Sequence, residues 1–358
     1  QNFMLLDFID CQGTKHKYYY KLLLFLNSKG LSYLSSLLIS FYRCFSKLVK
    51  KYTHPVIKEN IIMEDLIECA KKQSKMKSQK YTVSVIVPNY NYEKFMYERL
   101  YSILYQTKKV DEIIILDDCS TDNSRELIDN IVTTLSKYIN IKKIYNEKNS
   151  GSPFKQWEKG FKNATSDYVW IAEADDYCKK NFIASTMRSM KNNDDIVLSY
   201  VDTAFIDKNG KIILRTIKRE IDIMKTGHWD KNFVNDGIDE IKNYAYLNCT
   251  IANVSSVIFR RSEYNEFFKE SGSYRQAGDW LFYVNVMSQG KVAFTNKPIN
   301  FYRVHGNNVT STTKKKQHFN EIVKIHKTIE NKFKLNKKQK KEIEKRYKIG
   351  NYRRREIW

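Results

Sequence analysis

The chain has 358 residues, of which 42% are hydrophobic, so length and composition exclude a disordered protein and allow one large folded domain with extensions. Lysine and arginine outnumber aspartate and glutamate by 62 to 40, and the resulting charge of +22 favours phosphate-bearing partners, whether nucleic acid, an anionic membrane surface or a nucleotide. The six cysteines lie far apart without a Cys-x-x-Cys pair, which argues against a zinc site or a disulfide framework and fits a reducing cytosol.

The first 80 residues predict a helical extension that ends in a basic linker. Between Leu31 and Leu48, apolar residues recur every three or four positions, which is typical of an amphipathic helix. Such a helix packs on the main domain or on a partner helix, or it docks at a membrane interface. No apolar run reaches the roughly 18 to 20 residues of a membrane span. The polar stretch AKKQSKMKSQK, residues 70–80, predicts the linker, and residues 1–80 are also compatible with part of a longer, multi-domain chain.

From Tyr81 onward, predicted strands alternate with predicted helices. The strands are expected at 83–88, 112–117, 141–146, 167–172 and 195–201, and the helices near 93–106, 121–138, 153–163 and 179–190. This alternation favours an α/β fold with a mostly parallel, Rossmann-like sheet and helices on both faces.

After Val201 the pattern loosens. It contains a turn at 208–210, short elements, a strand at SSVIFR and a helix from about Trp280. From Lys314 to the end, the spacing predicts a basic helical tail.

Three of the predicted strands end in polar residues. The first ends in PNYNY, residues 88–92, the second before Asp118, and the fourth before Asp175 and Asp176. In a parallel sheet these loops leave the same carboxyl edge, where open α/β sheets bind their ligands. Converging carboxylates suit Mg²⁺ or Mn²⁺, which typically takes one or two carboxylates together with substrate phosphates.

Local structural roles compete with this interpretation. Ser120 or Asp122 is suited to cap the helix that follows it, and Asp176 is suited to a turn. The sequence contains neither a G-x-x-x-x-G-K-[ST] loop nor a G-x-G-x-x-G fingerprint, so P-loop and dinucleotide-binding functions lose their strongest support.

Three stretches carry a family resemblance: VSVIVPNYNYEKFMYERLYSILYQT, DEIIILDDCSTDNS and EKNSGSPFKQWEKGFKNATSDYVWIAEADD. In this order and spacing they closely resemble the donor-binding half of glycosyltransferase family 2, whose members have the GT-A fold. The similarity continues more weakly through NVSSVIFRR, AGDWLFYVNVMSQG and INFYRVHGNNVTS. It implies a GT-A domain over 81–312, with a nucleotide-sugar-binding half at 81–201 and an acceptor and catalytic half at 202–312. The extension at 1–80 and the basic tail at 313–358 lie outside it.

The resemblance also implies roles for individual residues of the donor site. The loop that contains Pro88 and Tyr90 holds the nucleotide base together with Asp118, which accepts from the ring N–H if the base is uracil. Asp175 approaches the ribose or the metal, and Asp176 ligates the metal at the diphosphate. Glu173 is expected to pack beside the site and not to ligate.

Four further residues match the family less directly. Asp279 matches the catalytic base, and its alternative is an N-cap for the helix beginning at Trp280. His305 matches a position that reaches the metal or the diphosphate, and its alternative is a structural histidine. Arg303 is a phosphate contact or a surface ion pair. Lys155 would supply to the phosphates the charge of an arginine that many relatives place after the glycine equivalent to Gly151.

The resemblance implies an inverting glycosyltransferase that depends on Mn²⁺ or Mg²⁺. It would move a sugar from a nucleoside diphosphate sugar, with a UDP-sugar favoured, to a hydroxyl of a bacterial surface glycan or a lipid-linked acceptor. The Q-x-x-x-W motif of processive synthases is missing after Asp279, so we expect the addition of one or a few sugars. The enzyme would work in the cytoplasm or at the inner face of the cell membrane, where basic segments meet anionic lipids.

Other functions remain as alternatives. One is a catalytically inactive glycosyltransferase-like scaffold or a carbohydrate-binding protein. A nucleotidyltransferase would show a glycine-rich loop after the first strand, and PNYNYEKF has no glycine. A nucleic-acid-binding protein would interleave aromatic residues with lysine and arginine on one face, whereas most aromatic residues here fall in predicted strands and apolar stripes, so no nucleic acid partner is expected.

Overall fold

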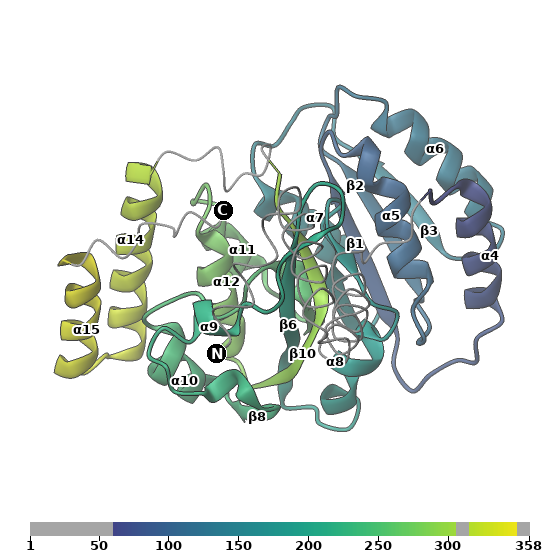
Figure 1. Cartoon of the computed structure of the whole chain (residues 1–358). Coiled ribbons are helices and arrows are strands. Elements are labelled where there is room, and N and C mark those ends of the chain that lie inside the picture. Colours follow the sequence, from purple (N-terminus) through teal and green to yellow (C-terminus); the bar gives the residue numbers. More distant parts are fainter. Residues whose placement is uncertain (1–59, 306–314, 349–358) are drawn as a thin grey trace, which may run out of the picture. The chain divides into compact units, whose positions relative to one another are not determined.

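The computed structural model describes residues 60–305 and 315–348, with the side chains of Arg219 and Lys315 left out. These residues belong to a compact unit that begins at Pro55 (Figure 1). The predicted amphipathic helix between Leu31 and Leu48 lies outside the described residues.

A mixed sheet forms the centre of this unit. Its described strands are β1 (Val83–Asn89), β2 (Glu112–Asp117), β3 (Ile141–Tyr145), β4 (Tyr168–Ile171), β5 (Tyr177–Cys178), β6 (Ile196–Ile206), β7 (Ile212–Leu214), β8 (Phe233–Asp236), β9 (Val257–Arg260) and β10 (Lys291–Arg303). The strand order is β3-β2-β1-β4-β9-β6-β10-β5, with β7 on β6 and β8 on β10.

The first four strands form the predicted parallel part. β1 pairs in parallel with β2 and β4, and β2 pairs in parallel with β3. All seven residues of β1 are buried, because Val85 and Val87 face one apolar cluster while Ile86 faces the other. The carboxyl ends of β1, β2 and β4 therefore meet at one edge, as the sequence predicts, and the α/β fold class is confirmed.

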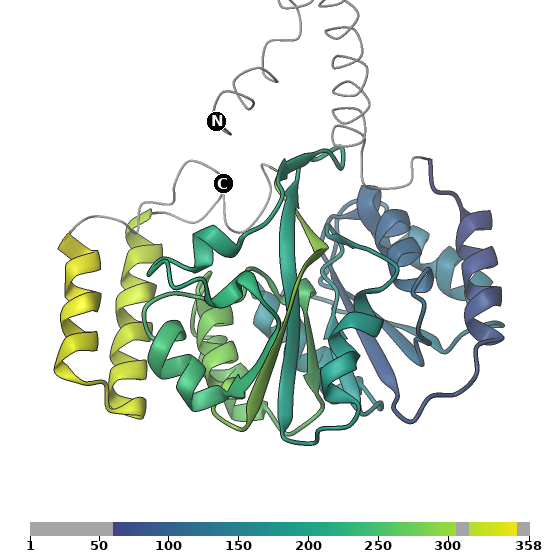
Figure 2. The ribbon, with the colours of Figure 1, turned by 60° about the horizontal axis from the view of Figure 1, so that its bottom comes forward.

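The second half of the sheet is mixed. β9 runs antiparallel to both β4 and β6, and β10 runs parallel to β6 (Figure 2). The sequence did not predict β10, because the polar residues 295–297 and Pro298 interrupt its apolar alternation, and the pairing shifts register there. This strand leads directly to Arg303 and His305.

Helices cover both faces of the sheet. The principal ones are α4 (Met63–Ser74), α5 (Glu93–Leu104), α6 (Ser124–Leu135), α7 (Pro153–Asn163), α8 (Phe182–Met190), α11 (Asn265–Ser271), α12 (Gly278–Met287), α14 (Lys315–Phe333) and α15 (Lys337–Lys348). The short α9 (Lys218–Ile221) and α10 (Gly237–Glu240) lie between β7 and β9. Buried residues of α4, α5, α6 and α8 share one apolar cluster, and those of α7, α11, α12 and α14 share the other.

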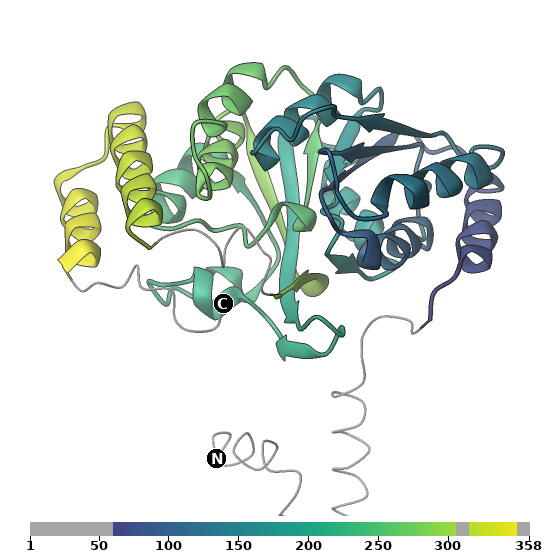
Figure 3. The ribbon, with the colours of Figure 1, turned by 90° about the horizontal axis from the view of Figure 1, so that it is seen from above.

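Helix α4 corrects the predicted linker. Residues 70–74 complete this helix, which packs against α5 and α6 (Figure 3). The buried Gln73 amide donates to the carbonyls of Leu104 and Gln106, both at 3.1 Å, and accepts from the Val110 N–H at 3.0 Å. The polar composition misled the prediction because Gln73 is satisfied by backbone groups and not by water.

The described part of the predicted basic tail, residues 315–348, forms α14 and α15 with a turn at 334–336, and it packs on the sheet domain. Ile322, Ile325 and Ile329 of α14 are buried in the same apolar cluster as α12. The Tyr246 hydroxyl bonds Glu342 of α15, and the Lys332 ammonium donates to Asn285 at 2.6 Å. These contacts make α14 and α15 part of the folded unit.

Across residues 60–305 and 315–348, no helix combines the length and the apolar character needed to cross a membrane. Cys119, Cys178 and Cys249 are free thiols.

His326 gives the C-terminal packing a pH dependence. The imidazole is 1% exposed, its ring meets Trp280 edge-on at 5.1 Å, and its Nδ1 lies 2.8 Å from the Tyr347 hydroxyl. Burial, together with the charge of Arg346, lowers the pKa of His326 to about 4. The folded state therefore binds fewer protons than the unfolded state between pH 6.5 and 4, and the free energy of unfolding falls as pH falls through this range.

We expect this loss to reach about 3 kcal/mol at most. Urea unfolding of the wild type and of His326→Leu between pH 7 and 4 measures it as the difference between the two pH profiles. Parallel profiles would contradict the buried, neutral state of His326.

Candidate active site

The loops after β1 and β2 are joined by hydrogen bonds. The Asn91 side-chain oxygen accepts from the Thr121 N–H at 2.7 Å, and the Ser120 hydroxyl accepts from the Asn91 N–H at 2.9 Å. Asn91 and Cys119 have positive φ values of 58° and 62°, a left-handed conformation that asparagine tolerates better than most residues. The two loops therefore form one bonded unit at the carboxyl edge.

Pro88 and Tyr90 occupy different positions in this unit. Pro88 is a buried strand residue paired with Leu116 of β2. Tyr90 lies one residue beyond β1 with its side chain 44% exposed, so its ring is available to a ligand. Their predicted contact with a nucleotide base stays a prediction.

Asp118 is held by a cradle of donors. Its Oδ1 accepts from the Asn146 amide at 2.7 Å, the Ser150 N–H at 2.8 Å and the Gln156 amide at 3.0 Å. Its Oδ2 accepts from the Ser150 hydroxyl at 2.7 Å. Oδ1 thus accepts three hydrogen bonds and Oδ2 only one, so Oδ2 is the oxygen with capacity for a further donor. Asp118 is thus a preorganised acceptor for an N–H group.

The neighbouring Asp117 faces into the protein instead. It is fully buried and accepts from the Asn89 amide at 2.9 Å and from Arg125 Nε at 2.8 Å. Burial acts to raise the pKa of Asp117, but hydrogen bonds from Ser120 and Arg125 outweigh it and hold the pKa below its usual range. The two adjacent carboxylates therefore have different tasks, Asp117 in the loop structure and Asp118 at the ligand edge.

Lys155 lies in the first turn of α7, close to the cradle. It is exposed, and its ammonium lies 3.3 Å from the Ser150 carbonyl. The predicted contact of Lys155 with phosphates stays a prediction.

Asp175, Asp176 and His305 come together beyond the ends of β4 and β10. His305 Nε2 lies 2.9 Å from Asp175 Oδ2. Asp176 accepts from the Arg303 N–H at 3.0 Å and from the Asn253 amide at 2.5 Å. Burial, followed by the charge of Asp175, raises the pKa of Asp176 above its usual range.

Arg303 is 1% exposed and turns toward protein acceptors. Its guanidinium donates to the carbonyls of Asp175 at 2.7 Å and Lys208 at 3.1 Å, and it pairs with Glu98 at 2.5 Å. Arg303 therefore fixes the loop that contains Asp175. This buried position differs from the predicted surface ion pair, and the predicted phosphate contact stays a prediction.

Glu173 lies beside this group. Its carboxylate accepts from the Trp157 indole N–H at 2.7 Å, and its backbone N–H donates to the Ser255 hydroxyl at 3.1 Å. Burial, followed by the charge of Asp175, raises the pKa of Glu173 to about 8. Glu173 and Trp157 link α7 to the carboxyl end of β4.

Asp279 lies in the first turn of α12, which begins at Gly278. Its predicted alternative role as an N-cap is wrong, because the N-cap position is Ala277 and the helix already includes Asp279. The Asp279 carboxylate, half-buried, accepts from the Trp280 N–H at 2.8 Å.

Tyr283, one turn further along α12, connects Asp279 to the other acids. Its hydroxyl is buried and has no hydrogen-bond partner among the described residues. Burial raises the pKa of Tyr283, and the charges of Asp279, Glu173 and Asp176 raise it further. Asp279 therefore acts electrostatically on the same buried tyrosine as Glu173 and Asp176.

The side chains at this edge suit a divalent cation that is shared with a phosphate ligand. Two carboxylates and an imidazole, from Asp175, Asp176 and His305, are donors that Mn²⁺ and Mg²⁺ accept. Within the described ranges, however, no three His, Cys, Asp or Glu side chains are placed to hold an ion by themselves. A cation at this edge would therefore need phosphate oxygens of a bound ligand to complete its shell.

The sequence did not indicate several supporting residues. Asn146 and Gln156 hold Asp118, Asn253 holds Asp176, and the buried Arg99 contributes a positive charge that acts to lower the pKa of Asp176. Spacing rules do not reveal amides from distant segments. A buried arginine within an otherwise apolar helix stripe, as at Arg99 in α5, is a signal that could have been used.

Comparisons with known proteins identify the family and the fold. The family model described as Glycosyl transferase family 2 matches residues 84–267. Glycosyltransferase GlyG of Streptococcus pneumoniae is 32% identical over 117 residues, which cover 32% of this chain and 38% of GlyG. A putative teichuronic acid biosynthesis glycosyltransferase of Bacillus subtilis, TuaG, is 25% identical over 237 residues, 66% of this chain and 84% of TuaG.

A crystal structure of Staphylococcus aureus TarS residues 1–349 in complex with UDP-GlcNAc superimposes with a TM-score of 0.52 at 20% identity. The superposition covers 69% of this chain and 66% of that one, and at this identity it shows the fold alone. The chain spans 38% of GlyG and 20% of the full TarS sequence, well under two thirds of either.

The matched region contains Asp118, Asp175 and Asp176, whereas Asp279, His305 and the C-terminal helices lie beyond it. Because the family model spans more than half of the 358 residues, and the α/β fold with its acidic carboxyl edge agrees with it, the chain belongs to glycosyl transferase family 2.

Proposed function

We propose that this chain transfers a sugar from a nucleoside diphosphate sugar, a UDP-sugar in the first place, to a hydroxyl of a bacterial surface glycan or its lipid-linked precursor. The observation that supports it best is that Asp118 and the Asp175–Asp176 pair with His305 lie beyond the carboxyl ends of β2 and β4, the two parallel neighbours of β1. Asp279 acts electrostatically on the same buried tyrosine, Tyr283, as Asp176. Family membership and the names of the relatives TarS and TuaG support the same class of reaction and acceptor.

The donor would lie along the carboxyl edge, with its base between the exposed Tyr90 and Asp118. The open position on Asp118 Oδ2 suits the ring N–H of uracil, which cytosine lacks. The diphosphate would then extend toward Asp175 and Asp176. Lys155, whose ammonium lies 3.3 Å from the Ser150 carbonyl, would add a positive charge close to Asp118 and the nucleotide.

Asp279 would act as the general base. It would accept the proton of the acceptor hydroxyl while that oxygen attacks the anomeric carbon, and the bond from this carbon to the diphosphate breaks with inversion. A bound Mn²⁺ or Mg²⁺, held by Asp176 and His305, would supply electrostatic stabilisation of the charge on the departing nucleoside diphosphate. Arg303 and Asn253 would orient the Asp175–Asp176 loop.

The proposal extends to where the enzyme works. The exposed lysines of α15, among them Lys338, Lys341 and Lys345, form a basic surface that suits peripheral contact with anionic lipids at the inner face of the cell membrane. This contact would bring a lipid-linked acceptor to the enzyme.

A catalytically inactive scaffold is the alternative function. The presence of Asp118, Asp175, Asp176 and Asp279, with Asp118 already held by four donor contacts, favours an active enzyme. Nucleotide binding without transfer would favour the scaffold.

The first prediction concerns nucleotide binding. Calorimetric titration with UDP, GDP, CDP and dTDP, each with Mn²⁺ and with chelator, should show metal-dependent binding of UDP. Asp118→Asn should weaken UDP affinity by about tenfold or more, because the amide offers one acceptor fewer and introduces a donor.

Asp194→Asn is the matched control, since this carboxylate is 98% exposed and precedes β6 at the opposite edge of the sheet. It should bind UDP like the wild type. Equal UDP affinity of the wild type and Asp118→Asn would show that Asp118 does not contact the nucleotide base. A chain that binds no nucleotide under any metal condition would refute the proposed function.

The second prediction separates chemistry from binding. Asp279→Asn keeps an acceptor for the Trp280 N–H but cannot take a proton, so we expect the rate of UDP release from a panel of UDP-sugars to fall by about a hundredfold or more. UDP affinity should stay within about twofold of the wild type. A variant that keeps the wild-type rate would show that Asp279 is not the base.

A further inference from the structure

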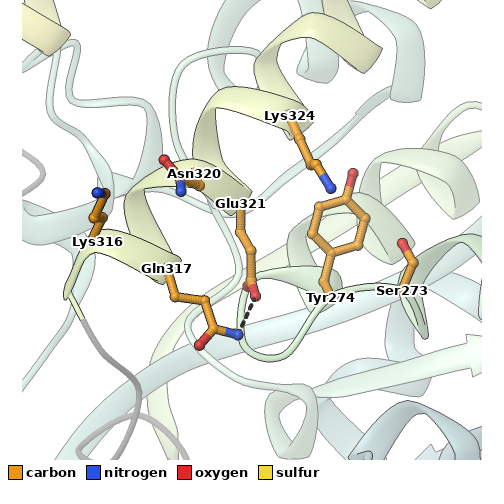
Figure 4. A pocket seen from close by; sticks show the side chains of 7 residues that line it. All are labelled: Ser273, Tyr274, Lys316, Gln317, Asn320, Glu321 and Lys324. Atoms are coloured by element: carbon orange, nitrogen blue, oxygen red, sulfur yellow. Dashed lines mark hydrogen bonds between the residues drawn. The ribbon is translucent and has the colours of Figure 1, made fainter.

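A groove lies between the start of α14 and the segment before α12. Its volume is about 440 Å³, within the usual range of roughly 300 to 1,000 Å³ for ligand pockets. Figure 4 shows side chains of α14 on one side of it and those of Ser273 and Tyr274 on the other. Because α14 lies outside the matched family region, this groove is a feature of the chain's own C-terminal part.

The charge of the groove is positive. Its acid, Glu321, is 8% exposed and accepts from three consecutive backbone N–H groups, those of residues 275, 276 and 277, at 2.9, 2.9 and 3.0 Å. These bonds place the carboxylate at the amino end of α12, where the helix dipole favours negative charge. These three donors therefore offset part of the negative charge that Glu321 contributes to the groove.

Two cations remain exposed in the groove. Lys316 and Lys324 both line it, and neither forms an ion pair within the described part of the chain. Lysine binds phosphate and carboxylate groups as a compact point charge. Ser273 and Asn320 add an exposed hydroxyl and an exposed amide, which suit the hydroxyl groups of a polyol or a sugar.

Two hydrogen-bonded links join the groove to the active site. Through Glu321 it contacts the three residues that precede Gly278 and Asp279. The second link starts at Arg275, one of these three residues, whose guanidinium donates to the Gly151 carbonyl at 2.8 Å. Gly151 directly follows Ser150, whose hydroxyl donates to Asp118. The groove therefore adjoins both the proposed base and the proposed donor loop.

We propose that this groove is an acceptor subsite that binds a negatively charged group, a phosphate or a carboxylate, of the acceptor glycan through Lys316 and Lys324. The inference rests on the proposed function and deepens it by giving the acceptor a chemical class. A chain of polyol or sugar units with regularly spaced negative charges would meet both lysines while one of its hydroxyls faces Asp279.

The test uses glycerol 3-phosphate and glucuronate as probes in ligand-observed NMR titrations of the full chain. Lys316→Ala/Lys324→Ala should weaken binding of the preferred probe by about tenfold. Lys191→Ala/Lys327→Ala removes the same charge from exposed positions outside the groove and should leave binding unchanged. Lys316→Arg/Lys324→Arg keeps both charges and should retain binding of the probe. Saturating UDP should not displace the probe.

Preference for glycerol 3-phosphate would point to a phosphate-bearing acceptor, and preference for glucuronate to a uronate-bearing one. Failure of both probes to bind the wild type, an equal loss in the control pair, or displacement of the probe by UDP would overturn the subsite. A wild type that binds a probe in the groove but not UDP would refute the proposed function alone, so the two failures are distinguishable.

Discussion

The burial of several carboxylates at one sheet edge is the constraint on which the rest of the structure depends. Asp117, Asp118, Asp175 and Asp176 are each at most 7% exposed. A buried charge without partners is costly, so each carboxylate requires donors from elsewhere in the chain. Arg125 donates to Asp117, and side chains between Asn146 and Gln156 donate to Asp118. The Arg303 N–H of β10 and the Asn253 amide donate to Asp176.

These partners explain why distant segments must meet. The loop after β3 has to fold over Asp118, and β10 has to run beside β6 until Arg303 reaches the Asp175 carbonyl. The same logic applies at Glu321, whose carboxylate holds the amino end of α12 from a helix outside the matched family region. Polar contacts, in addition to apolar packing, thus define how the C-terminal part joins the sheet.

The sequence allowed the fold and the location of the site to be predicted, because parallel strands are continuous apolar runs and their carboxyl ends are marked by Asp118 and Asp175. It did not allow the supporting contacts to be predicted. Gln156 and Asn253 meet their carboxylates only through tertiary structure, β10 is interrupted by Pro298, and α4 is too polar to resemble a packed helix. Arg303 was expected to contact phosphate or to form a surface ion pair, and its burial among acceptors from three segments was not predicted.

Gln73 has a consequence for how the chain can be shortened. Its amide satisfies the carbonyls of Leu104 and Gln106 and the N–H of Val110, all of which are main-chain groups of the sheet domain. A fragment trimmed to the matched residues 84–267 would lose Gln73, and the buried main-chain groups that pair with its amide would be left without this partner. The region recognisable by homology is therefore smaller than the region that has to be expressed for the protein to be stable.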